Sequence, residues 1–327
     1  MDFWAKSALC LNALRAPCVK FFYMAKIALA IHGGAGTILR SQMTPALEAE
    51  YRGGLDNALN SGWSILEKGG TSLDAVEAAV CALEDFPLFN AGRGAVFTHE
   101  GEVELDAAIM DGHKLRAGAI TFVKNIKNPV KLARLVMERT EHILLAGEGA
   151  NQFAEQNGVH LAPDEYFFTE HRWLQLQEAI ADGRVQLDHT AAKPMGTVGA
   201  VASDARGNLA AATSTGGMTN KKFGRVGDTA LIGAGTYADD VCAVSCTGHG
   251  EFFMLGVTAY DVAARMKYKG LSLDDAANET IGNLTSMGGD GGLIAVDASG
   301  NITLPFNSEG MYRGFTNGDL RDIQIYR

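Results

Sequence analysis

The residues with the clearest chemical potential are Gly196 and Thr197, which stand where a mixed polar segment gives way to a strand-like run, TVGAVAS. Glycine has no Cβ, so the Gly196 carbonyl is open to attack. Cleavage between the two residues would leave Thr197 with both a hydroxyl nucleophile and a free α-amine. Because an α-amine has a pKa of about 7.7–8.0, it can activate that hydroxyl near neutral pH. Taken alone, however, Thr197 is most simply the first residue of a strand.

Three neighbouring segments favour the chemical interpretation. Thr215 follows one hairpin later, and pairing of the two strands would bring it close to Thr197. Arg225 and Asp228 stand three residues apart and provide the charges that hold the α-carboxylate and α-ammonium of an amino acid, although an ordinary surface ion pair would look the same. The segment 245–250 (SCTGHG) adds a hydroxyl and exposed backbone for an oxyanion hole or a pocket wall.

Other catalytic designs find no support in the sequence. The segment 32–36 (HGGAG) looks like an esterase oxyanion loop, but the G-x-S-x-G segment that would carry the nucleophile is missing. The Lys-Ser/Thr pair of a phosphate-binding loop is also missing. No H-E-x-x-H motif or acidic calcium loop occurs. We therefore expect catalysis without a cofactor.

The elements that must position these residues follow from apolar periodicity and turn signals. Thr44-Pro45 and Ser72 begin two helices, the first of which ends at Gly69-Gly70. Between 157 and 195 the periodicity fades, which indicates a structureless linker. The remaining expected elements are strands at 27–31, 197–203, 209–213, 292–296 and 301–304, hairpins within 90–123, and helices at 128–139, 148–156 and 252–268. This order favours two packed sheets with helices outside them.

Composition narrows the class of protein. The chain has 327 residues, 39 glycines, 47% apolar side chains and a net charge of −10, so it can bury a large core. No cluster of Lys and Arg suggests a nucleic-acid partner, and no apolar run is long enough for a membrane span. Five cysteines without C-x-x-C spacing indicate a reducing compartment, and we expect a cytoplasmic protein.

The N-terminal segment 1–23 is set apart from the rest. It is moderately apolar but interrupted by Lys6, Arg15 and Lys20, whereas a clean strand pattern follows Met24. We interpret 1–23 as an extension of uncertain role. A secretory signal is the alternative, although the charges interrupt its apolar region.

Nine segments together resemble plant-type L-asparaginases, also called isoaspartyl peptidases, which are threonine-type N-terminal nucleophile hydrolases. The resemblance extends from about residue 26 to the C-terminus. GTVG, STGGMTNK and GRVGD are highly specific in combination, whereas HGGAG alone is weak. The matching segments are HGGAG (32–36), LEDFPLFNAGRGAVF (83–97), ELDAAIMDG (104–112), GTVGAVA (196–202), AATSTGGMTNK (211–221), GRVGDTALIGAGTYAD (224–239), SCTGHG (245–250), GGDGGLIAVD (288–297) and LPFNSEGMYR (304–313).

The resemblance implies an α+β fold, a four-layer αββα sandwich, made by autocleavage between Gly196 and Thr197. The α subunit would be 24–196, with 157–195 as its flexible linker, and the β subunit 197–327, the two forming one domain. The resemblance gives the site residues these roles: Thr197 as nucleophile, Thr215 as its hydrogen-bond partner, Asn90 and Thr247 as the oxyanion hole, Arg225 and Asp228 as holders of the substrate's α-groups, and Gly248 and Gly250 as backbone beside them.

The resemblance also implies a small-molecule substrate, either L-asparagine or a β-aspartyl dipeptide, and a dimer of cleaved protomers. It further implies a structural sodium ion bound by backbone carbonyls, for which the candidates are Leu83, Glu84, Phe86, Phe89, Ala91 and Arg93. Two alternatives stay open. One is a glycosylasparaginase-like amidase, which the Gly-Thr bond and the few cysteines disfavour, and the other is a non-catalytic homologue that remains uncleaved and only binds.

Overall fold

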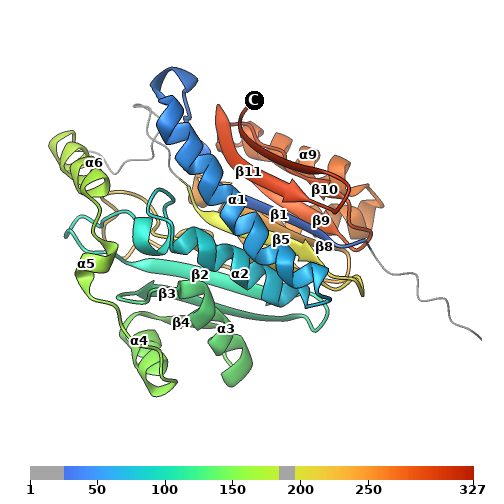
Figure 1. Cartoon of the computed structure of the whole chain (residues 1–327), viewed down its shortest axis with the longest axis horizontal. Helices are drawn as coiled ribbons and strands as arrows, with labels where there is room; N and C mark the ends of the chain where they lie inside the picture. Colours follow the sequence, from blue (N-terminus) through green and yellow to red (C-terminus); the bar gives the residue numbers. More distant parts are fainter. Residues whose placement is uncertain (1–25, 184–195) are drawn as a thin grey trace, which may run out of the picture.

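Two β-sheets lie at the centre of the computed structural model, which describes residues 26–183 and 196–327 (Figure 1). Within this part of the chain the larger sheet has the order β12-β11-β1-β5-β6-β2-β3-β4, and the smaller sheet the order β10-β9-β8-β7. The strands are β1 (Ala28–Gly36), β2 (Leu105–Asp111), β3 (Arg116–Val123), β4 (Leu144–Ala146), β5 (Val198–Ser203), β6 (Leu209–Thr215), β7 (Thr236–Ala238), β8 (Cys242–Gly248), β9 (Gly291–Asp297), β10 (Ile302–Thr303), β11 (Gly310–Thr316) and β12 (Arg321–Tyr326).

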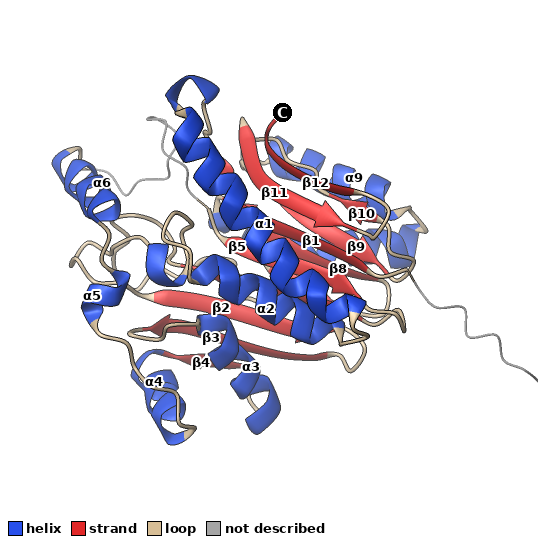
Figure 2. Cartoon of the chain, viewed as in Figure 1, coloured by secondary structure: helices blue, strands red, loops and turns tan. Residues whose placement is uncertain are grey.

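Helices cover the outer face of each sheet, so the fold is the expected four-layer α+β sandwich (Figure 2). Against the larger sheet pack α1 (Pro45–Glu67), α2 (Ser72–Glu84) and α3 (Pro129–Arg139), with α4 (Gly147–Gln156) beside them. Against the smaller sheet pack α7 (Gly250–Gly256), α8 (Thr258–Ala264), which continues as a π-helical turn Arg265–Lys269, and α9 (Leu273–Ser286). Not one helix in the described ranges is both long and apolar enough to cross a bilayer.

The alternation of side chains along β1 explains the layers. Leu29 and Ile31 point to the helical side and join the core beneath α1 and α2, whereas Ala28 and Ala30 point to the smaller sheet and pack in a second core with Val296. All of these side chains are buried. Small side chains on the inner face allow the two sheets to pack closely.

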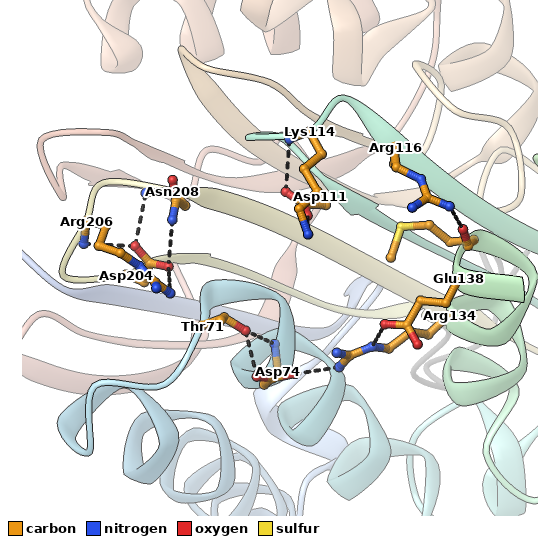
Figure 3. A network of polar contacts seen from close by, with 11 residues as sticks. Thr71, Asp74, Asp111, Lys114, Arg116, Arg134, Glu138, Asp204, Arg206 and Asn208 are labelled. Carbon is orange, nitrogen blue, oxygen red and sulfur yellow. Dashed lines mark hydrogen bonds and ion pairs between the residues drawn. The ribbon is translucent and has the colours of Figure 1, made fainter.

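The hairpin of β5 and β6 carries the two candidate threonines, and Asp204 fixes its turn (Figure 3). The Asp204 carboxylate is fully buried and accepts hydrogen bonds from the backbone N–H groups of Arg206 and Asn208, at 2.9 and 3.1 Å. A carboxylate that bonds the backbone two and four residues ahead specifies a tight turn. The turn in this way sets the register of the hairpin.

Arg134 connects the helices on the outer face (Figure 3). Its guanidinium lies 2.7 Å from the Asp74 carboxylate at the start of α2 and 2.8 Å from Glu138 within α3. Thr71 caps α2 by accepting a hydrogen bond from the Asp74 N–H. The ion pairs of Arg134 thus tie α2 to α3 on the side of the larger sheet that faces away from the smaller one.

Two expectations from the sequence need correction. Residues 90–104 form no hairpin: they contain only a 3-10 turn at Gly92–Gly94, and the hairpin in this region is β2–β3. The segment 157–183 is not structureless, because it contains α5 (Asp164–Phe167) and α6 (Glu170–Ala181). The buried face of α6 includes Arg172 and Gln175, polar side chains that conceal the helical periodicity. The rest of the expected linker, 184–195, and the extension 1–23 lie outside the described residues.

Candidate active site

Thr197 and Thr215 face each other at the ends of β5 and β6. The antiparallel pairing of Val198 with Ser214 places the next pair, the two threonines, opposite one another. Their Oγ1 atoms are hydrogen-bonded at 3.2 Å, and Thr215 Oγ1 also accepts the Gly217 N–H at 3.0 Å. Thr197 is the donor in the first contact, so Thr215 Oγ1 accepts both bonds and its own hydroxyl proton is used in neither. The hairpin predicted from sequence therefore does bring these hydroxyls together.

Gly196 lies directly against the turn formed by the HGGAG segment. A Cβ added to Gly196 would lie 2.0 Å from the Gly34 Cα and 3.0 Å from the Gly33 carbonyl oxygen. Gly34 itself has a φ of +116°, which other residues rarely adopt. The HGGAG segment is thus a surface of bare backbone against which the Gly196–Thr197 bond packs.

Arg225 and Glu251 form a bidentate ion pair at the opposite side of the pocket. Arg225 donates from Nε to Glu251 Oε1 and from Nη2 to Oε2, both at 2.9 Å. Partial burial opposes ionisation of Glu251, but the bonds from Arg225 prevail and lower the pKa of its carboxyl. A guanidinium has a second bidentate edge, formed by Nη1 and Nη2, and Nη1 lies next to the pocket-lining Gly227. Glu251 therefore orients Arg225 and leaves that edge for another carboxylate.

Asp228 is a buried carboxyl beside this guanidinium. Burial raises its pKa to about 7, and the opposing attraction of Arg225 only partly offsets this. Its Oδ2 atom is buried and has no hydrogen-bond partner among the described residues. A Cβ on Gly250 would lie 2.8 Å from Asp228 Oδ1 and 2.9 Å from Arg225 Nη2, so a larger residue at position 250 would push both charged groups aside. An ammonium group in the pocket would give Asp228 the partner that it lacks.

Asn90 presents an amide whose orientation is fixed. Its Oδ1 accepts the Val96 N–H at 3.0 Å, and its Nδ2 donates to the Gly217 carbonyl at 2.8 Å. One N–H of Nδ2 remains, and Asn90 lines the pocket. Thr247 lies further in: its side chain is fully buried, and its hydroxyl accepts the Ala35 N–H at 3.2 Å.

One pocket joins most of these groups and contains about 580 Å³ of empty space, its open mouth included. Of the predicted residues, those that line it are Asn90, Gly196, Thr197, Thr215, Arg225, Asp228 and Gly248. Thr247 and Gly250 do not line it but lie directly behind its wall.

Comparison with known proteins establishes the family of the chain. The profile of a family described as asparaginase matches residues 25–325. The chain belongs to this family. The asparaginase-family chain is 53% identical to the isoaspartyl peptidase of Salmonella typhimurium, over 93% of this chain and 100% of that protein. It is 51% identical to the isoaspartyl peptidase of Escherichia coli, over 93% and 97% of the two chains. It is 45% identical to the isoaspartyl peptidase/L-asparaginase of Xenopus laevis, over 92% and 96%.

The loop expected to hold sodium in this asparaginase-family chain offers backbone oxygens. The carbonyls of Phe86, Phe89 and Ala91 each accept one backbone N–H, at 2.9 to 3.4 Å, and a carbonyl oxygen has a second lone pair. The Leu83 carbonyl accepts two, from Asp85 and Phe86. The described residues include no cluster of three His, Cys, Asp or Glu side chains that could bind a metal. The loop therefore fits a hard cation bound by carbonyls alone.

Two contributors to the site were missed from sequence. Glu251 directly follows the SCTGHG segment, so the signal was an acid one residue past a recognised motif. Lys221 ends the STGGMTNK segment, and its buried ammonium donates to the Glu104 carbonyl at 3.2 Å. Lys221 thereby anchors the loop that follows Thr215.

Proposed function

We propose that this protein hydrolyses L-asparagine to aspartate and ammonia, or removes β-aspartyl residues from dipeptides, with Thr197 as its nucleophile. Both substrates present the same β-aspartyl half to the enzyme. The names of the relatives favour this function over the glycosylasparaginase-like and non-catalytic alternatives. The observation that carries the proposal is the 3.2 Å contact between Thr197 and Thr215 in the pocket that also holds Arg225 and Asp228.

The first step is cleavage of the Gly196–Thr197 bond, which separates an α subunit ending at Gly196 from a β subunit beginning at Thr197. Cleavage gives Thr197 a free α-amine with a pKa of about 7.7–8.0. This amine takes the proton of the Thr197 hydroxyl, while the Thr215 hydroxyl donates to the same oxygen. The close packing of Gly196 against Gly34 supports this assignment, because it fixes the peptide bond that must break.

The substrate is held by its α-groups. Its carboxylate pairs with the Nη1–Nη2 edge of Arg225, which Glu251 leaves open, and its ammonium pairs with Asp228. Gly248 provides backbone beside these groups, and Gly250 makes room for them. This arrangement directs the substrate's side-chain carbonyl toward Thr197.

Chemistry proceeds through an acyl-enzyme. Thr197 Oγ1 attacks the side-chain carbonyl carbon, and the remaining Asn90 N–H stabilises the oxyanion. The Thr247 hydroxyl, the second donor that the resemblance implies, is fully buried behind the pocket wall. The C–N bond breaks, and the Thr197 ammonium gives its proton to the leaving ammonia or amine. Water then hydrolyses the β-aspartyl ester, which releases aspartate and restores Thr197.

Replacement of Thr197 tests the proposal directly. Thr197→Ala removes the hydroxyl, so we expect intact mass spectrometry to find one uncleaved chain, with no hydrolysis of asparagine or of a β-aspartyl dipeptide. Thr197→Ser retains a hydroxyl and is the matched control, which should still cleave. Two fragments from the alanine variant would refute the assignment. Kinetics on both substrates with the wild-type enzyme would establish which is preferred.

Three further parts of the proposal concern the surroundings of the site. A structural sodium ion would be held by the carbonyls of 83–93 and would stiffen the loop that carries Asn90, and exchange of sodium for choline chloride should then lower the melting temperature.

A dimer of cleaved protomers is supported by exposed apolar side chains at Leu255, Val257 and Met287, and light scattering would measure it. A cytoplasmic location is supported by free thiols at Cys81, Cys242 and Cys246.

A further inference from the structure

His32 is a buried histidine that bridges the two sheets at the nucleophile. It belongs to β1 of the larger sheet and has no solvent exposure. Its Nδ1 lies 2.9 Å from the backbone carbonyl oxygen of Thr197, and its Nε2 lies 2.9 Å from the hydroxyl of Ser245 on β8. The histidine thus touches the reacting residue through the backbone and not through the hydroxyl.

The chemistry of the partners fixes the position of every proton. A carbonyl only accepts, so Nδ1 carries the hydrogen, and in the neutral ring Nε2 then accepts from the Ser245 hydroxyl. Ser245 has then used its proton and accepts from Thr213, at 2.7 Å. Thr213 in turn accepts from Thr236, at 2.6 Å. A directed chain of hydrogen bonds therefore runs from Thr236 through both sheets and ends at the Thr197 carbonyl.

Two hydroxyls of this hydrogen-bond chain have a second possible acceptor, but at a longer distance. The Thr213 hydroxyl also approaches the Gly235 carbonyl, and Thr236 approaches the Thr229 carbonyl, but at 3.4 and 3.2 Å. Burial lowers the pKa of His32 to about 3, although the bond to the Thr197 carbonyl opposes this. His32 is consequently neutral at any working pH, and its ring neither gives nor takes a proton during the reaction.

Gly199 is the glycine that makes room for this arrangement. A Cβ at position 199 would lie 2.0 Å from Ser245 Oγ and 2.4 Å from His32 Nε2. Both side chains are fully buried, and moving either atom would break the hydrogen bond between them. The second glycine of the GTVG segment is therefore required by the bond between His32 and Ser245.

The position of Thr197 in the sheet gives this contact its importance. The pairing of β5 with β1 ends at Gly199, opposite His32, and its pairing with β6 ends at Val198. Thr197 lies beyond both ladders. Once the bond to Gly196 is cut, no upstream chain restrains the residue, and its described restraints are the Thr215 hydroxyl on the side chain and His32 on the backbone.

We infer that His32, held in one tautomer by Ser245, is a positioning residue that fixes the backbone of the nucleophilic Thr197 after cleavage. The inference rests on the proposed function of Thr197. It assigns the histidine of the HGGAG segment a role distinct from that of its glycines, which provide close backbone packing. It also explains why a histidine occupies an apolar strand position between two sheets.

Two amide substitutions distinguish the hydrogen bond made by His32 Nδ1 from the one made by Nε2. In His32→Asn the amide nitrogen can occupy the position of Nδ1 and still donate to Thr197. In His32→Gln the amide reaches the position of Nε2 and keeps Ser245, but loses Thr197. Both variants lose the ring, so a purely structural role predicts equal effects. With activity expressed per cleaved chain, we expect kcat of His32→Asn to fall about threefold and kcat of His32→Gln about 100-fold, with KM nearly unchanged, as for a misplaced nucleophile.

Equal kcat values for the two variants, or losses confined to KM, would overturn the inference. Thr197→Ala distinguishes this failure from failure of the proposed function: if it is inactive while the two His32 variants are equally active, only the role of His32 is wrong. A second measurement needs no variant. The ¹⁵N shifts of histidine-labelled wild-type enzyme should show His32 protonated on Nδ1 and neutral across the working pH range, and an Nε2–H tautomer would overturn the inference regardless of whether the variants fold.

Discussion

Asp228 should reduce stability in exchange for substrate binding, and Asp228→Asn tests this. The carboxyl is buried and its Oδ2 has no hydrogen-bond partner within the described residues. Burial raises its folded-state pKa to about 7, against an ordinary value of 3.8. The folded protein therefore binds this proton more tightly than the unfolded chain, and stability is lost as the pH rises from about 4 to about 7. Above that range the carboxyl is ionised in both states and the loss is complete.

The size of this loss follows from the shift. About three pKa units at about 1.36 kcal/mol each correspond to about 4 kcal/mol of unfolding free energy. The amide introduced by Asp228→Asn is neutral at every pH, so the variant would not undergo this loss. The new amide adds an offset of its own, but that offset does not vary with pH. We therefore expect variant and parent to differ only by that offset near pH 4, and the variant to gain about 4 kcal/mol over the parent by about pH 7.

The measurement needs a single uncleaved chain, so both proteins carry Thr197→Ala. Urea unfolding at closely spaced pH values from about 4 to about 8 gives the free energy of unfolding of each. Other buried groups with shifted pKa values, such as His32 and Glu84, contribute equally to the pH dependence of both proteins and cancel in the difference. A difference that stays flat over this range would refute the reasoning, because it would mean that Asp228 ionises in the fold as easily as in water. In the protein that keeps Thr197, Asp228→Asn should abolish saturable binding of substrate.

Two further substitutions probe the groups around the nucleophile and the substrate. Thr215→Val keeps the shape of the side chain but removes the partner of the Thr197 hydroxyl, so kcat per cleaved chain should fall about 100-fold with little change in KM, and a preserved kcat would show that Thr215 is dispensable. Glu251→Gln weakens the bond that orients Arg225, so KM should rise about tenfold while kcat changes less than about twofold, as for lost uniform binding. A fall in KM would instead mean that Glu251 competes with the substrate carboxylate.

The site was easier to predict from sequence than the elements near it. Thr197 and Thr215 were brought together by simple hairpin pairing, a local rule that requires no knowledge of the fold. Arg225 and Asp228 were predicted from charge and spacing, and they lie in the same pocket as the threonines. The convergence of the hairpin and the charged loop on one pocket came from the resemblance, since no periodicity specifies it.

The features that sequence reasoning missed have a common physical cause: buried polar side chains satisfied by distant parts of the chain. Arg172 of α6 is nearly fully buried and donates to the carbonyls of Gly94 and Leu88. In the sequence it looks like a solvent-exposed residue of a polar linker. His32 is similar, because its two partners are 165 and 213 residues away. Hydrophobic patterning detects apolar burial, and it cannot detect burial that depends on hydrogen bonds across the fold.

Glycines around the candidate site allow close backbone approach, and three positions show what each absence of a Cβ makes possible. At Gly196 a Cβ would push the scissile bond off the turn at Gly34. At Gly199 it would break the contact between His32 and Ser245, and at Gly250 it would displace Arg225 and Asp228, the two charges proposed to hold the substrate. The clash at Gly196 is with backbone, and those at Gly199 are with fully buried side chains, whereas those at Gly250 are with the ends of the Asp228 and Arg225 side chains. The glycines of these motifs therefore matter for the space that they leave around Thr197, just as the other motif residues matter for their reactive or charged groups.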